Sequence, residues 1–144
     1  MGLEQRPARV SAVWDTGATG TAVSARIAQS LGLRPIAKTE ARAVNATEIV
    51  NVYSIDVMLP NGVGILNVRA IEAQNLGEFD VLLGMDIIGL GDFAITNADN
   101  QTWFSFRVPP DIKHIDYTAD AEAIRAKRER RITTKKLKRR GFLR

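Results

Sequence analysis

The chain has 144 residues, which is enough for one domain with a sizeable buried core. It contains no cysteine and a single histidine, His114, so disulfides and metal sites built on thiolates or several histidines are excluded. The net charge of +4 comes from the C-terminal tail, because residues 1–120 carry 9 basic and 14 acidic side chains and residues 121–144 carry 11 and 2.

The N-terminal residues 1–6 lack the apolar stretch of a secretory signal, and no apolar run approaches the ~18 residues of a membrane-spanning helix. We therefore expect a soluble, cytoplasmic protein that does not contact a membrane. The composition also leads us to expect neither a metal nor a cofactor.

A short buried strand is predicted for residues 9–14, ending at the Asp-Thr-Gly tripeptide of residues 15–17. Apolar residues at helical spacing then predict a helix over residues 24–31. Ser24 has the side chain of a helix N-cap, and Gly32 can end the helix in a left-handed conformation.

A β-hairpin is predicted in the middle of the chain. Residues 48–59 are rich in Val, Ile and Tyr and alternate apolar with polar side chains. Asn61-Gly62 follows, a pair that favours a tight turn because both turn positions need positive φ. Residues 64–73 return as the partner strand.

The second half of the body continues with short elements. Residues 79–83 form an apolar run that is too short for a helix and ends at Gly84, which fits a buried strand. Residues 85–90 predict one or two helical turns, and residues 93–95 and 102–108 predict two more strands.

Many short strands with one or two short helices indicate an all-β domain. We assign residues 1–110 to this domain and residues 111–144 to a linker and a basic C-terminal tail.

Asp15 is the candidate catalytic residue, because its turn places a carboxylate at the end of an apolar strand. Two carboxylates that face each other cannot both ionise cheaply, so they share one proton. The ionised member takes a proton from water, and the protonated member polarises the carbonyl of a peptide bond. Such a pair can therefore hydrolyse peptide bonds.

Neighbouring residues would support the turn. The hydroxyl of Thr16 can hydrogen-bond to a partner turn, Gly17 lets backbone approach a substrate closely, and Ala18 completes the motif. The alternative is an ordinary Asp turn or helix cap, which explains most Asp-Thr-Gly tripeptides.

A second motif distinguishes these interpretations. Residues 13–18 read Val-Trp-Asp-Thr-Gly-Ala, and Val-Leu-Leu-Gly follows at 81–84, with Leu82, Leu83 and Gly84 as its last three residues. In this order and spacing the chain resembles the retropepsin-like aspartic proteases over about residues 9–108. The resemblance implies a small acid-protease barrel with one lobe per chain, in which Leu82, Leu83 and Gly84 pass behind the catalytic turn and support it.

The resemblance is closer to the non-viral branch of the family. Retroviral enzymes pair an Asp two residues after the catalytic Gly with an Arg after the later Gly. The corresponding residues here are Thr19 and Met85, so both partners of that ion pair are absent.

By its order in the family, the substrate-covering flap falls at about residues 42–50. Its tip residues are Val44, Asn45, Ala46 and Thr47, and the stretch contains no glycine.

A single Asp-Thr-Gly requires a second copy of the chain. We find no other Asp followed by a small residue and Gly, and we interpret the remaining acids of the body as loop, cap or surface charges; these are Asp56, Asp80, Asp86, Asp92 and Asp99. A symmetric homodimer would bring two Asp15 side chains together. The resemblance implies that residues 102–108 and 3–9 pair across the interface.

The sequence thus predicts a homodimeric aspartic endopeptidase that acts on polypeptides. The alternative is a catalytically silent member of the same fold that serves as a dimerisation or peptide-binding module. The basic tail, residues 121–144, is either a solvated segment, a non-specific nucleic-acid contact, or a segment that docks on the acidic body or is itself cleaved.

Overall fold

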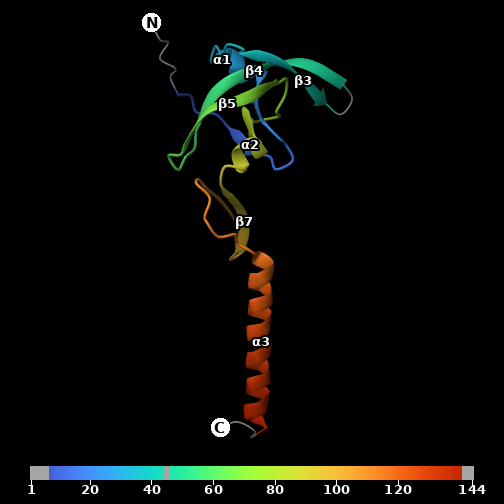
Figure 1. Cartoon of the computed structure of the whole chain (residues 1–144), viewed down its shortest axis with the longest axis vertical. Coiled ribbons are helices and arrows are strands. Elements are labelled where there is room, and N and C mark those ends of the chain that lie inside the picture. The colour runs from blue at the N-terminus through green and yellow to red at the C-terminus, as the bar shows by residue number, and fades with distance from the viewer. Residues whose placement is uncertain (1–6, 44–45, 141–144) are drawn as a thin grey trace. The chain divides into compact units, whose positions relative to one another are not determined.

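The computed structural model describes residues 7–43 and 46–140. The chain divides into two compact units, Met1–Pro110 and Asp111–Arg144, each of which is described separately (Figure 1).

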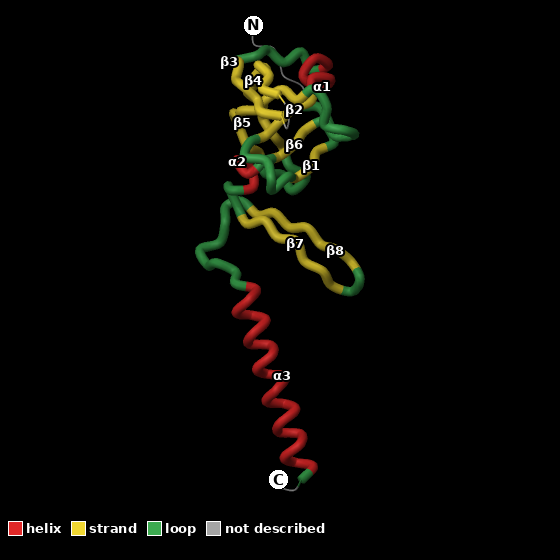
Figure 2. The backbone as a smooth tube through the Cα atoms, turned by 90° about the vertical axis from the view of Figure 1, so that its right-hand side faces the viewer, coloured by secondary structure: helices red, strands yellow, loops and turns green. Residues whose placement is uncertain are grey.

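Six strands of the first unit form one mixed sheet, in the order β1-β6-β2-β5-β4-β3 (Figure 2). Their bounds are β1 Ala12–Trp14, β2 Thr21–Ser24, β3 Ala37–Ala43, β4 Ala46–Met58, β5 Gly64–Ala73 and β6 Val81–Leu83. Strand β1 runs parallel to β6 and β2 runs parallel to β5, whereas the other neighbours are antiparallel. The prediction of an all-β body is confirmed; among the described residues the end strands β1 and β3 do not pair with each other, so the sheet stays open.

The core lies on the face of the sheet where alternate residues of β5 are buried. Val68 is 6% exposed and Ala70 is fully buried, whereas Arg69 between them faces the other side. The remaining members of the core come from five other elements, and they are Val23, Ala28, Tyr53, Val81, Leu83 and Ile87. The alternating apolar residues of β4 pack against this cluster, as the sequence pattern predicts.

Buried Tyr53 has a polar partner. Its hydroxyl donates a hydrogen bond to the carboxylate of Glu72, and Asn51 Nδ2 donates to the same carboxylate at 3.2 Å. Burial raises the pKa of Tyr53, and the hydrogen bond to Glu72 raises it further. The phenol therefore stays protonated and joins β4 to β5 through side chains.

Two short helices follow strands β2 and β6 of the sheet. In α1 (Ala25–Ser30), the Ser24 side chain accepts a hydrogen bond from Ile27 N at 3.3 Å, and Gly32 has a φ of 62° beyond the helix end. Both features match the predicted start and stop. Helix α2 (Met85–Ile88) follows β6 directly and buries Ile87 and Ile88.

A separate two-stranded ribbon follows α2, formed by β7 (Asp92–Ala98) and β8 (Gln101–Arg107). It turns at Asp99-Asn100, whose φ values are 52° and 59°. The ring of Trp14 on β1 contacts three rings of this ribbon at centroid distances of 4.8 to 5.7 Å; they belong to Phe93, Phe104 and Phe106. The aromatic face of the ribbon therefore packs on the strand that leads into the Asp-Thr-Gly turn.

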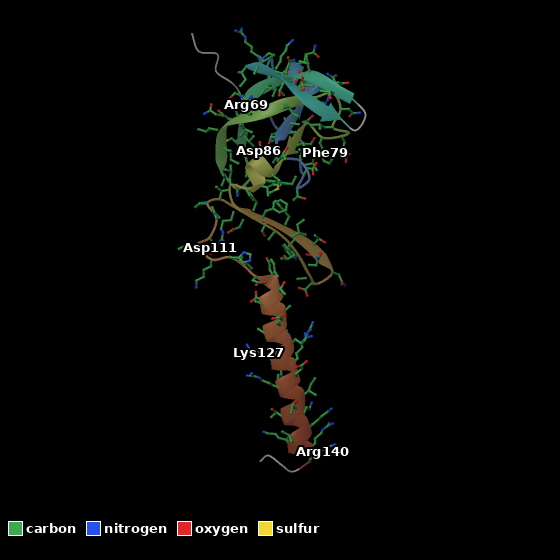
Figure 3. The ribbon with its side chains drawn as sticks, turned by 45° about the vertical axis from the view of Figure 1, so that its right-hand side comes forward. Arg69, Phe79, Asp86, Asp111, Lys127 and Arg140 are labelled. Atoms are coloured by element: carbon green, nitrogen blue, oxygen red, sulfur yellow. The ribbon has the colours of Figure 1, made fainter. Side chains whose placement is uncertain are left out.

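The second unit contains helix α3 (Tyr117–Arg139). Its N-cap is Asp116, whose carboxylate accepts from Thr118 N at 2.9 Å and Ala119 N at 3.1 Å. None of its side chains is buried, and they project on opposite sides of the helix (Figure 3). Across the described part of the chain, no helix combines the length and the apolar character needed to cross a bilayer.

Candidate active site

Asp15 is placed by backbone pairing between β1 and β6. The two strands are parallel, with Trp14 opposite Leu83, and Asp15 N continues the ladder by donating to Leu83 O at 2.9 Å. The carboxylate is half-buried at the point where the chain leaves the sheet. Leu83 therefore holds the main chain of Asp15 directly.

The turn after β1 orients the carboxylate. Gly17 N donates to Asp15 Oδ1 at 2.8 Å, and Ala18 N donates to Asp15 O at 3.3 Å. A Cβ at position 17 would lie 3.2 Å from Oδ1, so glycine leaves room for this contact. No described residue donates to the other oxygen, Oδ2, and the exposed Thr16 makes no hydrogen bond to the described residues. One carboxylate oxygen is thus fixed and the other is available.

Gly84 lets the supporting strand lie directly against the loop that follows the turn. A Cβ at position 84 would lie 2.4 Å from Gly20 O and 3.0 Å from Ala18 O, far closer than packed atoms allow. Met85 N also donates to Ala18 O at 2.8 Å. The structure therefore brings the three predicted supporting residues together with the turn: Leu83 through its carbonyl, Gly84 by close approach, and Leu82 through pairing with Val13.

Asp86 is a further residue that holds this loop. It lies in the first turn of α2 (Figure 3), and its carboxylate accepts from Thr21 N at 3.0 Å and from Thr21 Oγ1 at 2.9 Å. Asp86 is an exposed acid in the first turn of a helix, as the interpretation of it as a loop, cap or surface charge expects, and it also makes this contact with Thr21. Thr21 and Asp86 are 65 residues apart in the sequence, so no local sequence pattern predicts this contact.

The Thr21–Asp86 contact joins the same two segments that the retroviral ion pair would join. At the corresponding positions, Thr19 O accepts from Asp86 N at 3.2 Å and Met85 contributes only its backbone. In this chain, a hydroxyl-to-carboxylate hydrogen bond links the two segments.

The acid at the start of β6 is not part of the turn. Asp80 is 9% exposed and accepts from Ser11 N at 2.9 Å, and it forms an ion pair with Arg26. The Ser11 N–H lowers the pKa of Asp80 most, with further lowering by Arg26 and the Ser11 hydroxyl, whereas burial opposes them. Asp80 is thus held ionised and joins the strand before Asp15 to α1.

A hollow of about 420 Å³ opens beside the turn. One side consists of residues 17–21, and the other side comes from β3, β4 and β5 through Thr39, Val52, Arg69 and Ile71. The hollow therefore lies between the loop after Asp15 and the hairpin expected to form the flap.

The predicted flap tip is described only in part. Val44 and Asn45 lie outside the described residues; Ala46 begins β4, where it pairs with Ala43, and Thr47 is exposed and pairs with Arg42. Strands β3 and β4 do form a hairpin at this position, so the order of elements agrees with a flap. Thr47 is not among the described residues that line the hollow.

The described residues contain no group of three or more His, Asp or Glu side chains that could hold a metal ion. The arrangement instead offers one oriented carboxylate on a rigid turn beside an open groove.

Comparisons with known proteins identify a family and similar solved structures. The family model described as "gag-polyprotein putative aspartyl protease" matches residues 5–89. A retropepsin-like aspartic protease from Rickettsia conorii aligns with 18% identity and a TM-score of 0.41, covering 65% of this chain and 74% of that chain. No curated protein matches the chain. The matched region contains both the Asp15 turn and the β6–α2 segment behind it, and the chain belongs to the gag-polyprotein aspartyl protease family.

Proposed function

We propose that the chain is one half of a homodimeric aspartic endopeptidase, in which Asp15 and the Asp15 of a second copy share one proton. The observation that carries this proposal is the Asp15 turn. Its Oδ1 is fixed by Gly17 N, while no described residue donates to Oδ2. Oδ2 can therefore bind a proton or a water molecule that a second carboxylate also contacts.

Three acids among the described residues of the body already have partners of their own. Asp80 is bound to Ser11 and Arg26, Asp86 to Thr21, and Glu72 to Tyr53. A symmetric dimer supplies the missing carboxylate with no further residue, since each copy presents the same turn on the two-fold axis.

The β7–β8 ribbon supports the proposal as a dimer contact. Ile95 and Phe104 lie opposite each other, and they are 60% and 47% exposed on the ribbon face that also packs on Trp14. Because Trp14 precedes Asp15, two ribbons that bury these side chains against each other would do so close to the two turns.

Mixing of wild-type and Asp15→Asn chains tests the shared dyad. Asparagine cannot share the proton, so a mixed dimer should be inactive. With equal amounts of both chains and random pairing, about a quarter of the dimers keep two aspartates. Peptidase activity should therefore fall to about a quarter of the value for wild-type chains alone at the same total concentration. A fall to one half would mean that each chain acts by itself and would overturn the dyad. Asp120→Asn, the same change on α3, should leave activity at its full value.

We further propose that α3 binds nucleic acid non-specifically. The helix carries nine Lys and Arg side chains against three acids, and none of its residues is buried. Phosphate contacts made by such a helix would release counterions and would weaken as salt rises.

Four substitutions near the end of α3 test this second proposal in the full chain. Replacing Lys135, Lys136, Lys138 and Arg139 by Gln should lower affinity for duplex DNA equally for all sequences. The slope of log affinity against log salt should fall by about 0.9 for each phosphate that is no longer neutralised. A control with Gln at Thr133 and Thr134 should bind as the wild type does. Unchanged affinity and slope in the four-Gln protein would overturn the proposal.

A further inference from the structure

Among the described residues that line the groove beside the Asp15 turn, Arg69 has the one charged side chain. The other lining residues are backbone or uncharged side chains, namely Gly17, Ala18, Thr19, Gly20, Thr21, Thr39, Val52 and Ile71. Val52 is 1% exposed and gives the groove an apolar floor. A single guanidinium at the edge of an otherwise neutral groove is the feature that any occupant would meet.

Arg69 is held in place by its strand but has no acidic partner. It lies on β5 (Figure 3), opposite Ser54 of β4. The next residue of the strand, Ala70, pairs with Thr21 of β2. Its side chain is exposed, and no carboxylate among the described residues pairs with it. Two other arginines of the body differ, since Arg26 pairs with Asp80 and Arg107 pairs with Asp92.

A guanidinium of this kind recognises carboxylates. Its planar set of donors fits the two oxygens of a carboxylate, and such charge-assisted hydrogen bonds are stronger than neutral ones. An extended peptide bound along a sheet places alternate side chains into pockets. A side chain with an apolar stem and a terminal carboxylate would cover Val52 and reach Arg69.

The position of the groove relates this side chain to the reacting bond. Residues 17–21 line it, whereas Asp15 does not. The groove would therefore hold a substrate residue at some distance from the scissile bond, and not the residue whose carbonyl is attacked.

We propose that Arg69 selects peptide substrates that carry a glutamate or aspartate side chain at one position away from the scissile bond. The proposal rests on the peptidase function proposed above, and it makes Arg69 a specificity-determining residue with no part in the chemical step.

The test compares Glu and Gln at each position of a decapeptide library, in sub-libraries that fix one position at a time. The wild type should cleave with kcat/KM about 10-fold higher for Glu at one position. Arg69→Gln should remove this preference, and Arg69→Glu should replace it by a preference for Lys at the same position. Arg34→Gln, the same change on an exposed loop, is the control and should keep the preference. Equal cleavage of Glu and Gln peptides at every position, or a preference that survives in Arg69→Gln, would overturn the inference.

A binding measurement separates this inference from the proposed activity. Fluorescence polarisation of the same labelled sub-libraries on Asp15→Asn protein should show tighter binding of the Glu members, again abolished in the double variant with Arg69→Gln. If no peptide is cut but binding follows Arg69, the inference holds and the peptidase proposal fails. If Asp15-dependent cleavage occurs with no Arg69-dependent preference in either assay, the inference fails and the peptidase proposal stands.

Discussion

The carboxylate of Asp86 accepts hydrogen bonds from both the backbone N–H and the hydroxyl of Thr21, at 3.0 and 2.9 Å. Thr21 is 1% exposed, so its two donors have no access to water. The loop between Asp15 and β2 is consequently fastened at its far end by a residue of α2.

Removing that contact should loosen the loop. In Asp86→Ala, the buried donors of Thr21 lose their acceptor, and we expect a loss of about 1–2 kcal/mol in the free energy of unfolding. Urea denaturation measures it. In a double-mutant cycle with Thr21→Val, the two losses should be less than additive, because both substitutions remove the same interaction. Full additivity would show that the two side chains do not interact.

Gly84→Ala should disturb the turn through packing alone. The new methyl group would lie 2.4 Å from Gly20 O, so the loop has to move, at a cost of about 1–3 kcal/mol. Gly20→Ala, on the other side of the same contact, meets no atom within 4 Å and is the matched control. Thermal unfolding should therefore separate the two variants by several degrees. Equal melting temperatures would contradict the close approach.

Acid should weaken the body through Asp80. Its pKa is lowered from the ordinary value of 3.8, so its contribution to stability is complete above that pH and is lost as pH falls through the folded-state pKa. The melting temperature should drop below about pH 4. Asp80→Asn should be less stable at pH 7 but should show a flatter profile in acid.

The order of causes can be read from a second variant. Arg26 lowers the pKa of Asp80 less than the Ser11 N–H does. In Arg26→Gln, the dependence of melting temperature on pH should therefore flatten less than in Asp80→Asn. If Arg26→Gln flattens the profile fully, the ion pair and not the backbone donor holds the pKa of Asp80 down.

The β7–β8 ribbon should control the oligomeric state. Ile95→Lys places a charge on the exposed face that packs on Trp14, and we expect it to raise the dimer dissociation constant about 10-fold or more. Analytical ultracentrifugation measures this constant. Ser105→Lys puts the same charge on the opposite face of the ribbon and is the control. Equal effects of both substitutions would place the interface elsewhere.

Local sequence patterns predicted the structure correctly where residues close in the sequence determine it. The strand at 64–73 has the predicted bounds, and Ser24 caps α1 as expected. Both depend on alternation or on a side chain three residues from its partner, which a sequence displays directly.

Turn geometry was predicted less well. The hairpin at Asn61-Gly62 exists, but of its two turn residues only Gly62 has positive φ, at 84°. Both turn residues adopt positive φ instead at Asp99-Asn100, between the two strands predicted for residues 93–95 and 102–108. Asn and Asp tolerate this region, so the type of turn was settled by the twist and register of the flanking strands.

Long-range pairing could not be predicted. Strand β2 was not expected, because Thr21–Ser24 becomes a strand only through β5 and β6, about 50–60 residues away in the chain. The role of Asp86 depends on the same pairing. The parts of the site that depend on such contacts, including the groove with Arg69, could be identified only from the three-dimensional structure.

The aromatic packing around Trp14 gives the protein an internal optical probe. Only two tryptophans are present, and the second, Trp103, is 55% exposed on the ribbon. In a Trp103→Phe protein all indole emission would come from a ring that touches three phenylalanines and is joined by one peptide bond to Asp15. Its wavelength and quenching would follow events at the turn in real time, with no label attached.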